Sequence, residues 1–182
     1  MSAPARYIYL QRRQFVEQLL PLFQQYYHQI ANHYPQHQPE TTHITYLSDL
    51  DESDDLYSLH TQRLARDKAA NRTTAGTHLD ELTFLLSEQP ARQAASQGQR
   101  KTYLLALKFA QYALMRQAQP QRRPILLLDD LFDKLDEDRT RALLQLIAQR
   151  DQFGQIFLTD TNAARLQPLL EELQRDYRLF PL

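Results

Sequence analysis

Two adjacent carboxylates, Asp129 and Asp130, follow a short aliphatic run, and a further carboxylate, Asp136, follows at short range. The run spans residues 125–128 after Pro124, and it predicts a strand buried on both faces, as in the centre of a parallel α/β sheet. The carboxylates then fall at the carboxyl end of the strand, where ligand sites of open α/β sheets form. There one carboxylate can hold Mg²⁺ through water while its neighbour polarises an attacking water.

A hydrophobic strand that ends in two aspartates has the pattern of a Walker B motif, which serves nucleotide hydrolysis. Asp129 would then bind Mg²⁺ through water, and Asp130 would occupy the position of the catalytic base. The same residues also suit a plain buried strand followed by an acidic turn that caps the next helix. The stretch alone does not decide between the two interpretations.

The residues Ser96, Gly98 and Gln99 form a second constellation, at the start of a helical pattern that ends shortly before the strand. A serine and a glycine at a helix start offer a hydroxyl and free N–H groups to a phosphate. An ordinary N-cap explains Ser96 equally well. Arg100 and Lys101 could assist phosphates or DNA. The helix has one apolar face that should pack on the core, formed by Tyr103, Ala106, Leu107, Ala110 and Leu114.

The stretch from Ala95 to Asp136 (ASQGQRKTYLLALKFAQY, then PILLLDDLFDKLD) resembles the RecF family of ABC-type ATPases. The motifs occur in the order and at the spacing of that family. The resemblance extends over most of the chain, more weakly before about residue 70, and it covers only the carboxyl-terminal half of the family. It implies that Ser96, Gly98 and Gln99 are a signature motif that contacts the γ-phosphate of ATP held by the opposite subunit. It also implies that Leu135 and Asp136 form the D-loop at the dimer interface.

The fold that follows is α/β, the carboxyl-terminal part of an ABC-type ATPase head with its P-loop NTPase sheet, preceded by a mostly helical lobe. We place the lobe, part of the second RecF-like domain, at residues 1–72 and the head at residues 73–182. The expected helices cover about residues 5–34, with Pro21 kinking or dividing the helix, about 54–71, a stretch that opens at 96–99 and ends shortly before the aliphatic strand, 137–150 and 163–175. The expected strands cover residues 43–47, 83–86, 124–128, 155–159 and 177–180, of which 83–86 would return to the ATPase sheet and 155–159 would complete a right-handed βαβ unit.

Two departures from the family pattern predict slow hydrolysis. Many ABC-type ATPases carry a γ-phosphate-sensing histidine after the second buried strand, but here the candidates are Thr161 and Asn162. Many relatives also carry glutamate where this chain has Asp130, and the shorter carboxylate must lie closer to the attacking water or act through a second water. A third family segment, Gly76-x-His78-x-Asp80, is present with Glu81 in place of a second aspartate. We assign no role to it, except that His78 suits a structural hydrogen bond.

Composition limits what the chain can do alone. Its three glycines are widely separated, so it lacks the clustered glycines and Lys-Ser/Thr of a P-loop. It has no cysteine, which excludes disulfides and cysteine metal sites and fits a reducing cytoplasm. No apolar run approaches the roughly 18 residues of a membrane span, so we expect no membrane partner. A basic segment at 91–123 lies next to an acidic one at 129–138, which suits a site for phosphates and a metal.

The resemblance implies a DNA replication and repair protein of the SOS response that uses ATP and Mg²⁺. It would form a homodimer on ATP binding, bind DNA at junctions between single strand and duplex, and help load recombinase with mediator proteins, while hydrolysing ATP slowly. The DNA-contacting residues are not identified. Because the amino-terminal P-loop half is missing, we expect a fragment, a split gene product or a truncated reading frame that is inactive by itself, with an exposed sheet edge and a tendency to aggregate or dimerise.

Two other interpretations remain. The chain could be a non-enzymatic α/β interaction module that binds an intact ABC-type ATPase through its signature helix and D-loop. It could also belong to the chromosome-structuring ATPases, although the lack of long heptad runs argues against that class.

Overall fold

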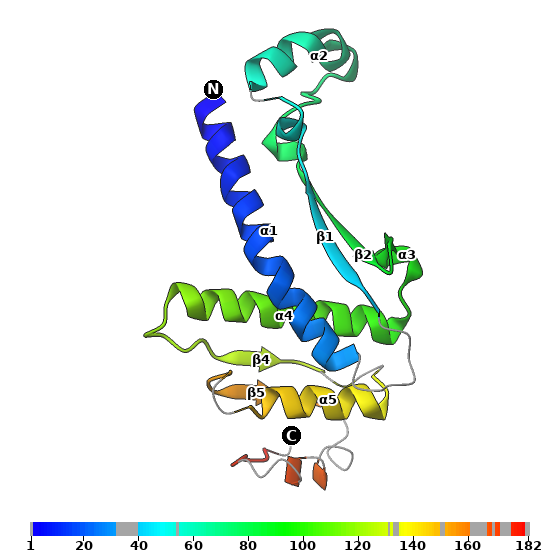
Figure 1. The fold of residues 1–182 in the computed structure, drawn as a ribbon, viewed down its shortest axis with the longest axis vertical. Helices are drawn as coiled ribbons and strands as arrows, with labels where there is room; N and C mark the ends of the chain where they lie inside the picture. The colour runs from blue at the N-terminus through cyan, green and yellow to red at the C-terminus, as the bar shows by residue number, and fades with distance from the viewer. Residues whose placement is uncertain are drawn as a thin grey trace.

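The computed structural model describes residues 2–31, 40–53, 55–130, 132, 135–149, 152–160, 167–168, 170–171 and 176–180. In chain order, the elements are α1 (Ser2–Ala31), β1 (Thr42–Leu47), the 3-10 helix η1 (Asp49–Asp51), α2 (Leu56–Ala70), the 3-10 helix η2 (Thr77–Leu79), β2 (Glu81–Leu86), β3 (Gln89–Pro90), α3 (Ala91–Ala94), α4 (Gln97–Ala118), β4 (Leu126–Leu128), α5 (Glu137–Ile147) and β5 (Ile156–Leu158). Figure 1 shows a body of α4, α5, β4 and β5, an arm of α1, β1 and β2 that rises from it, and a tip that contains α2.

Helix α1 runs the length of the arm as one 30-residue element that contains Pro21. Of the two effects predicted for Pro21, the division of the helix is therefore wrong, and the kink stays a prediction. Pro21 and Glu17 are both exposed, so the carbonyl group that loses its intrahelical partner at a proline can be hydrated. At the tip, Asp55 caps α2 by accepting hydrogen bonds from the N–H groups of Tyr57 and Ser58, both at 3.1 Å. A carboxylate at this position also suits the positive end of the helix dipole.

The arm contains an antiparallel sheet in the order β1-β2-β3. Strand β1 pairs with β2 from Thr42 opposite Leu86 to Leu47 opposite Glu81. The prediction that residues 83–86 return to the ATPase sheet is therefore wrong. These residues pair with β1, and Leu85 and Leu86 also pair with β3, in a sheet separate from that of β4 and β5. Ser87 and Glu88 both have positive φ, as a two-residue hairpin turn requires. This sheet crosses residue 72, and the division of the chain at that residue stays a prediction.

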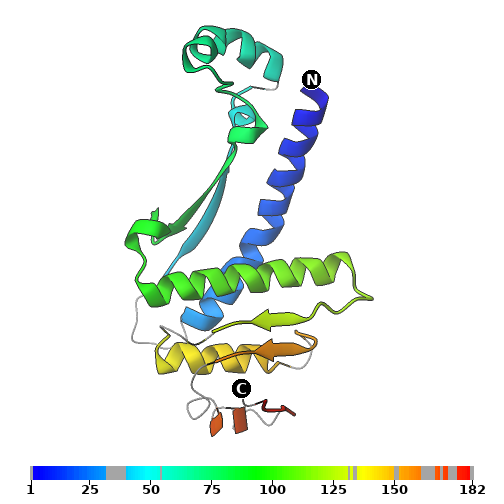
Figure 2. The same ribbon diagram turned by 180° about the vertical axis from the view of Figure 1, so that it is seen from behind.

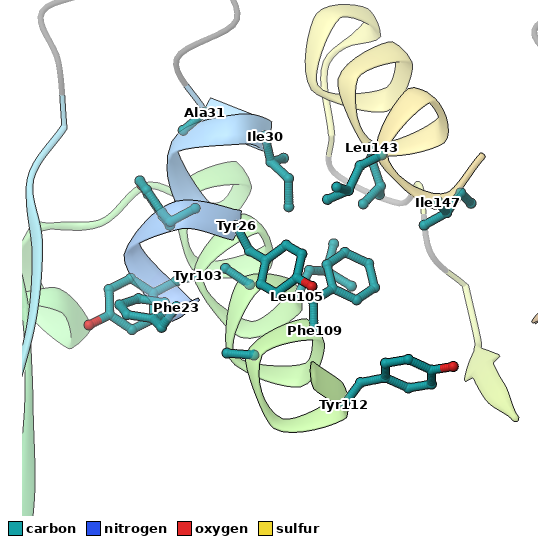
Figure 3. Packing of buried hydrophobic residues seen from close by; sticks show 14 of the residues in the cluster. Phe23, Tyr26, Ile30, Ala31, Tyr103, Leu105, Phe109, Tyr112, Leu143 and Ile147 are labelled. Carbon is teal, nitrogen blue, oxygen red and sulfur yellow. The ribbon is translucent and has the colours of Figure 1, made fainter. Parts of the chain in front are cut away.

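Helix α4 lies across the lower part of α1, and both views show β4 and β5 side by side beneath it (Figures 1 and 2). Aromatic rings fill the contact between the two helices (Figure 3). The ring centroids of Phe23 and Tyr103 are 4.6 Å apart, and those of Tyr26 and Phe109 are 5.7 Å apart. The predicted inner face of α4 is confirmed, with Tyr103, Ala106 and Ala110 buried and Leu107 and Leu114 partly buried.

The body sheet is parallel, with Leu126, Leu127 and Leu128 opposite Ile156, Phe157 and Leu158. Tyr112 joins the starts of the two strands, because its hydroxyl donates to the carbonyl of Pro124 at 3.0 Å and accepts from the N–H of Gly154 at 2.9 Å. A Cβ on Gly154 would lie 3.3 Å from that same carbonyl oxygen, so the close approach of the two segments favours glycine.

The prediction that β4 is buried on both faces is wrong. Leu126 and Leu128 are 7% and 3% exposed, but Leu127 between them is 68% exposed. Its neighbour on β5, Phe157, is 48% exposed. Within the described residues, the helices cover one face of this sheet and leave the other bare.

The end of the chain departs from its prediction. Residues 176–180 are described and contain no strand, so the strand expected at 177–180 is wrong. These residues are exposed and pair with no strand of the described part of the chain, and a single extended segment has no ladder hydrogen bonds to hold it. Of the closing helix expected at 163–175, only 167–168 and 170–171 are described, and they are helical.

Candidate functional site

The predicted signature residues open α4 with a reciprocal cap. The Ser96 hydroxyl accepts from the backbone N–H of Gln99 at 3.2 Å, and the side-chain oxygen of Gln99 accepts from the N–H of Ser96 at 2.7 Å. The capping interpretation of Ser96 is therefore confirmed. The first N–H groups of a helix have no partner inside it, so those of Gln97 and Gly98 remain available to an anion.

The Gln99 side chain has a second partner that no sequence motif indicated. Its amide nitrogen donates to a carboxylate oxygen of Glu40 at 2.8 Å. Glu40 also accepts from the hydroxyl of Tyr27 and from the guanidinium of Arg139 at 3.4 Å. The sequence places Glu40 in a polar, proline-containing loop, and nothing in its local pattern distinguishes it from a solvated residue.

At the carboxyl end of β4, Thr159 joins the carboxylate of Asp129 to the backbone of Asp130, the two residues of the predicted Walker B motif. The Thr159 hydroxyl donates to the Asp129 carboxylate and accepts from the N–H of Asp130, the latter at 3.1 Å. The parallel register delivers this contact, because the N–H of Thr159 donates to the Leu128 carbonyl at 2.9 Å. Both aspartates are exposed. The expected convergence of polar groups at the carboxyl ends of the two strands is therefore present.

The turn after β4 is also fixed from α4. The ammonium of Lys101 donates to the backbone carbonyl oxygen of Asp130 at 2.7 Å. Asp130 has a left-handed backbone with φ of 46°, a conformation that aspartate adopts more readily than most residues. Because Lys101 lies about one and a half helical turns after the Ser96 cap, this contact links the start of α4 to the turn that follows β4.

The predicted D-loop residues lie at the start of α5. Leu135 is buried, and Asp136 caps the helix by accepting from the N–H of Arg139 at 2.7 Å. The guanidinium of Arg139 lies 3.8 Å from the other carboxylate oxygen of Asp136. The helix-capping interpretation of Asp136 is confirmed. Thr161 and Asn162, the candidate γ-phosphate sensors, lie outside the described residues.

The donor set at Asp129 and Asp130 fits Mg²⁺. This ion takes one or two carboxylates, keeps several waters and completes its shell with substrate phosphates. The two exposed carboxylates at one strand end, with Thr159 fixing an oxygen of Asp129, offer that arrangement. Asp129 would hold the ion through water, and the ion would neutralise charge on the phosphates.

The segment Gly76-x-His78-x-Asp80 lies at the junction of the arm and the tip, apart from the body (Figure 1). The Asp80 side chain is 3% exposed and accepts from Arg12 at 2.6 Å and from Tyr46 at 2.5 Å. His78 makes a hydrogen bond with the Thr73 hydroxyl at 3.1 Å, which confirms its structural role. Burial first, and then the bond to Asp80, raise the pKa of Tyr46 to about 12.

No helix in the described part of the chain is long and apolar enough to span a membrane. The same residues contain no group of three or more histidine, aspartate or glutamate side chains that could hold a metal ion among themselves.

No protein-family model matches the chain. It is 43% identical over 180 residues to a DNA replication and repair protein RecF of Azobacteroides pseudotrichonymphae, which covers 99% of this chain and 47% of the relative. A RecF of Parabacteroides distasonis is 40% identical over 173 residues, which cover 95% of this chain and 45% of that protein. The chain thus spans about half the length of these curated relatives, and the matching half is the carboxyl-terminal one.

A solved structure of the recombination mediator protein RecF with ATP has the same fold, with a TM-score of 0.65 and 24% identity over 87% of this chain and 42% of that one. The architecture is therefore the carboxyl-terminal part of an ABC-type ATPase head preceded by a mostly helical lobe. With relatives of this identity over nearly its whole length, the chain is homologous to the carboxyl-terminal half of RecF proteins.

Proposed function

We propose that this chain is the carboxyl-terminal half of a RecF-type ATPase that acts in DNA replication and recombinational repair, including the SOS response, in the cytoplasm. In the complete protein, ATP binding would bring two copies together on DNA at single-strand gaps and duplex junctions. Slow hydrolysis would separate them again, and mediator proteins would load recombinase at the same place. The relatives support the repair role by their name, and a RecF structure with ATP supports the nucleotide.

The observation that carries the proposal is the Walker B turn. Thr159 from β5 and Lys101 from α4 fix the backbone and one carboxylate from two sides. Asp129 is then placed to hold Mg²⁺ through water, and Asp130 to accept a proton from the water that attacks the γ-phosphate. An aspartate in the base position suits slow turnover.

Residues at the starts of α4 and α5 would act on the nucleotide of the opposite subunit. The Ser96 hydroxyl and the N–H groups at Gln97 and Gly98 would contact its γ-phosphate, with Gln99 holding the loop in shape through the cap. Leu135 and Asp136 would lie across the interface beside it. A site divided in this way makes hydrolysis depend on dimerisation.

The phosphate cradle must come from an amino-terminal half. The bare face of the body sheet, with Leu127 at 68% and Phe157 at 48% exposure, is the surface that this half would cover. An apolar sheet face of this kind is stable when another layer packs on it.

The test supplies the missing half. The 182-residue chain is co-expressed with the amino-terminal half of the Azobacteroides relative, and ATP hydrolysis and fluorescent-ATP binding are measured. We expect weak binding and no hydrolysis by the chain alone, tight binding by the pair, and slow turnover that requires both halves and Mg²⁺. A matched pair that carries a Lys→Ala change in the P-loop of the added half controls for contaminating ATPase. A pair that assembles without hydrolysing ATP would contradict the proposal.

The absence of a P-loop from the sequence favours a second candidate, the non-enzymatic interaction module. Under that function the chain would bind intact RecF through the starts of α4 and α5 without restoring hydrolysis to an isolated amino-terminal half. Addition of the chain to intact RecF should then lower its ATP-dependent dimerisation, whereas the split ATPase should leave the intact protein unaffected.

A further inference from the structure

Glu40 lies just before β1 and gathers three donors from three helices. Tyr27 of α1 donates to one carboxylate oxygen. The other oxygen accepts from Gln99 of α4 at 2.8 Å and from Arg139 of α5 at 3.4 Å. We call Tyr27, Glu40, Gln99 and Arg139 the Glu40 cluster.

The three donors of the cluster suit a carboxylate acceptor. Gln99 and Arg139 present N–H donors, and Tyr27 presents an O–H donor because burial, followed by the bond to Glu40, raises its pKa above the usual range. A carboxylate accepts at both oxygens and so can satisfy all three donors. The side chains of Glu40 and Arg139 are each 17% exposed, so the loss of either charge would leave the other poorly solvated.

Two members of the cluster connect directly to the proposed trans-acting motifs. Gln99 uses its side-chain oxygen to hold the N–H of Ser96 at 2.7 Å. Arg139 donates its backbone N–H to Asp136 at 2.7 Å, and its guanidinium faces the same carboxylate. A continuous polar path therefore runs from Ser96 through Gln99, Glu40 and Arg139 to Asp136.

We propose that Glu40 and Arg139 are positioning residues that fix the signature motif and the D-loop relative to each other, so that one subunit presents both to its partner as a rigid pair. This inference rests on the proposed function for its consequence in hydrolysis. The contacts of Glu40 with Gln99 and of Arg139 with Asp136 distinguish this ion pair from one that only stabilises the core. The charge at Glu40 therefore stabilises the ATP-bound dimer. It has no effect on the affinity of a single subunit for ATP.

The main experiment uses the pair of halves described above, with Glu40→Gln, Arg139→Gln and the double variant. The matched control is Glu17→Gln, because Glu17 forms an exposed ion pair with Arg13 at 3.2 Å on the arm. We expect each cluster variant to weaken ATP-dependent dimerisation and lower kcat by about tenfold, with unchanged ATP affinity of the undimerised pair. The double variant should lose less than the sum of the two single changes, because both single changes break the ion pair between Glu40 and Arg139.

Additive losses in the double variant, or dimerisation and kcat equal to those of Glu17→Gln, would overturn the proposal. A fall in ATP affinity with kcat retained would also overturn it, since that result indicates a general structural role.

A second measurement separates this inference from the proposed function. If the wild-type pair does not hydrolyse ATP, the proposed function fails, and amide hydrogen exchange in the 182-residue chain still tests the cluster. Glu40→Gln should speed exchange in the first turns of both α4 and α5, and Glu17→Gln should not. Faster exchange at only one of the two helix starts would refute the connection between them.

Discussion

The ammonium of Lys101, in the first turns of α4, lies 2.7 Å from the backbone carbonyl oxygen of Asp130. The contact joins a residue next to the signature motif to the residue proposed as the base. We expect Lys101→Met, which keeps the length of the side chain, to lower ATP turnover by the paired halves by about tenfold, because a shift of the Walker B turn misplaces the base. Lys68→Met on exposed α2 is the control. If turnover is equal in the two variants, the contact has no part in catalysis.

Asp130 has a left-handed backbone, so two substitutions can separate the effect of its charge from the effect of its conformation. Asn tolerates positive φ as well as aspartate does, so Asp130→Asn should keep the fold while turnover falls by about a hundredfold or more. Asp130→Glu should instead destabilise the chain by about 1 kcal/mol, because longer side chains are strained at positive φ. Denaturant unfolding of both variants measures the difference. Equal unfolding free energies would mean that the turn is not strained.

Thr159 should govern the dependence on Mg²⁺. Its hydroxyl contacts both the Asp129 carboxylate and the Asp130 N–H. Thr159→Val keeps the shape and removes both contacts, so we expect the Mg²⁺ concentration for half-maximal turnover to rise by about tenfold, in line with the effect of groups that orient metal ligands. Thr159→Ser should preserve the wild-type value. A Mg²⁺ titration of hydrolysis would reject this role if Val and Ser behaved alike.

Alkaline pH should lower the stability of the arm. Burial and the bond to Asp80 raise the pKa of Tyr46 from 10.0 to about 12, so the folded state holds this proton more tightly than the unfolded state does. The stabilisation is fully present below pH 10 and is lost as the pH rises from about 10 to 12. Unfolding in denaturant across this range should show a steeper loss for the wild type than for Tyr46→Phe. Parallel curves would rule out a contribution from Tyr46.

The bare face of the body sheet gives a binding prediction. Leu127 is 68% exposed, so Leu127→Lys should leave the stability of the chain alone unchanged. Its affinity for the amino-terminal half should fall by at least about tenfold, because burial of a leucine side chain contributes about 1.5–3 kcal/mol. Leu64→Lys, at an exposed leucine of α2, is the control. Undiminished assembly of Leu127→Lys would place the amino-terminal half elsewhere.

The sequence predicted the local structure at the start of α4 and at β4, because each depends on neighbouring residues. A serine followed three residues later by glutamine defines the cap of α4, and an apolar run before two aspartates defines β4 and its turn. The pairing of β2 with β1 was missed because a strand pattern does not name its partner. The prediction that β4 is buried on both faces was wrong. A run of aliphatic residues shows that both faces of a strand can be buried, but the described helices cover only the face opposite Leu127.

Glu40 shows a different limit of prediction. Its three partners come from residues 27, 99 and 139, and no periodic pattern relates them to one another. A lone glutamate in a polar loop is usually solvated. Only the packing of α1, α4 and α5 against one another makes it an acceptor for three donors.

Helix α1 has a consequence for how distant parts of the protein move. Its 30 residues span about 45 Å at the standard helical rise. About a third of the way along it, Arg12 contacts Asp80 at the junction with the tip, and near its carboxyl end Tyr27 contacts Glu40. One continuous helix therefore contacts both the tip junction and the Glu40 cluster, so we expect a tilt of the tip to displace the carboxyl end of α1 and the Glu40 carboxylate with it.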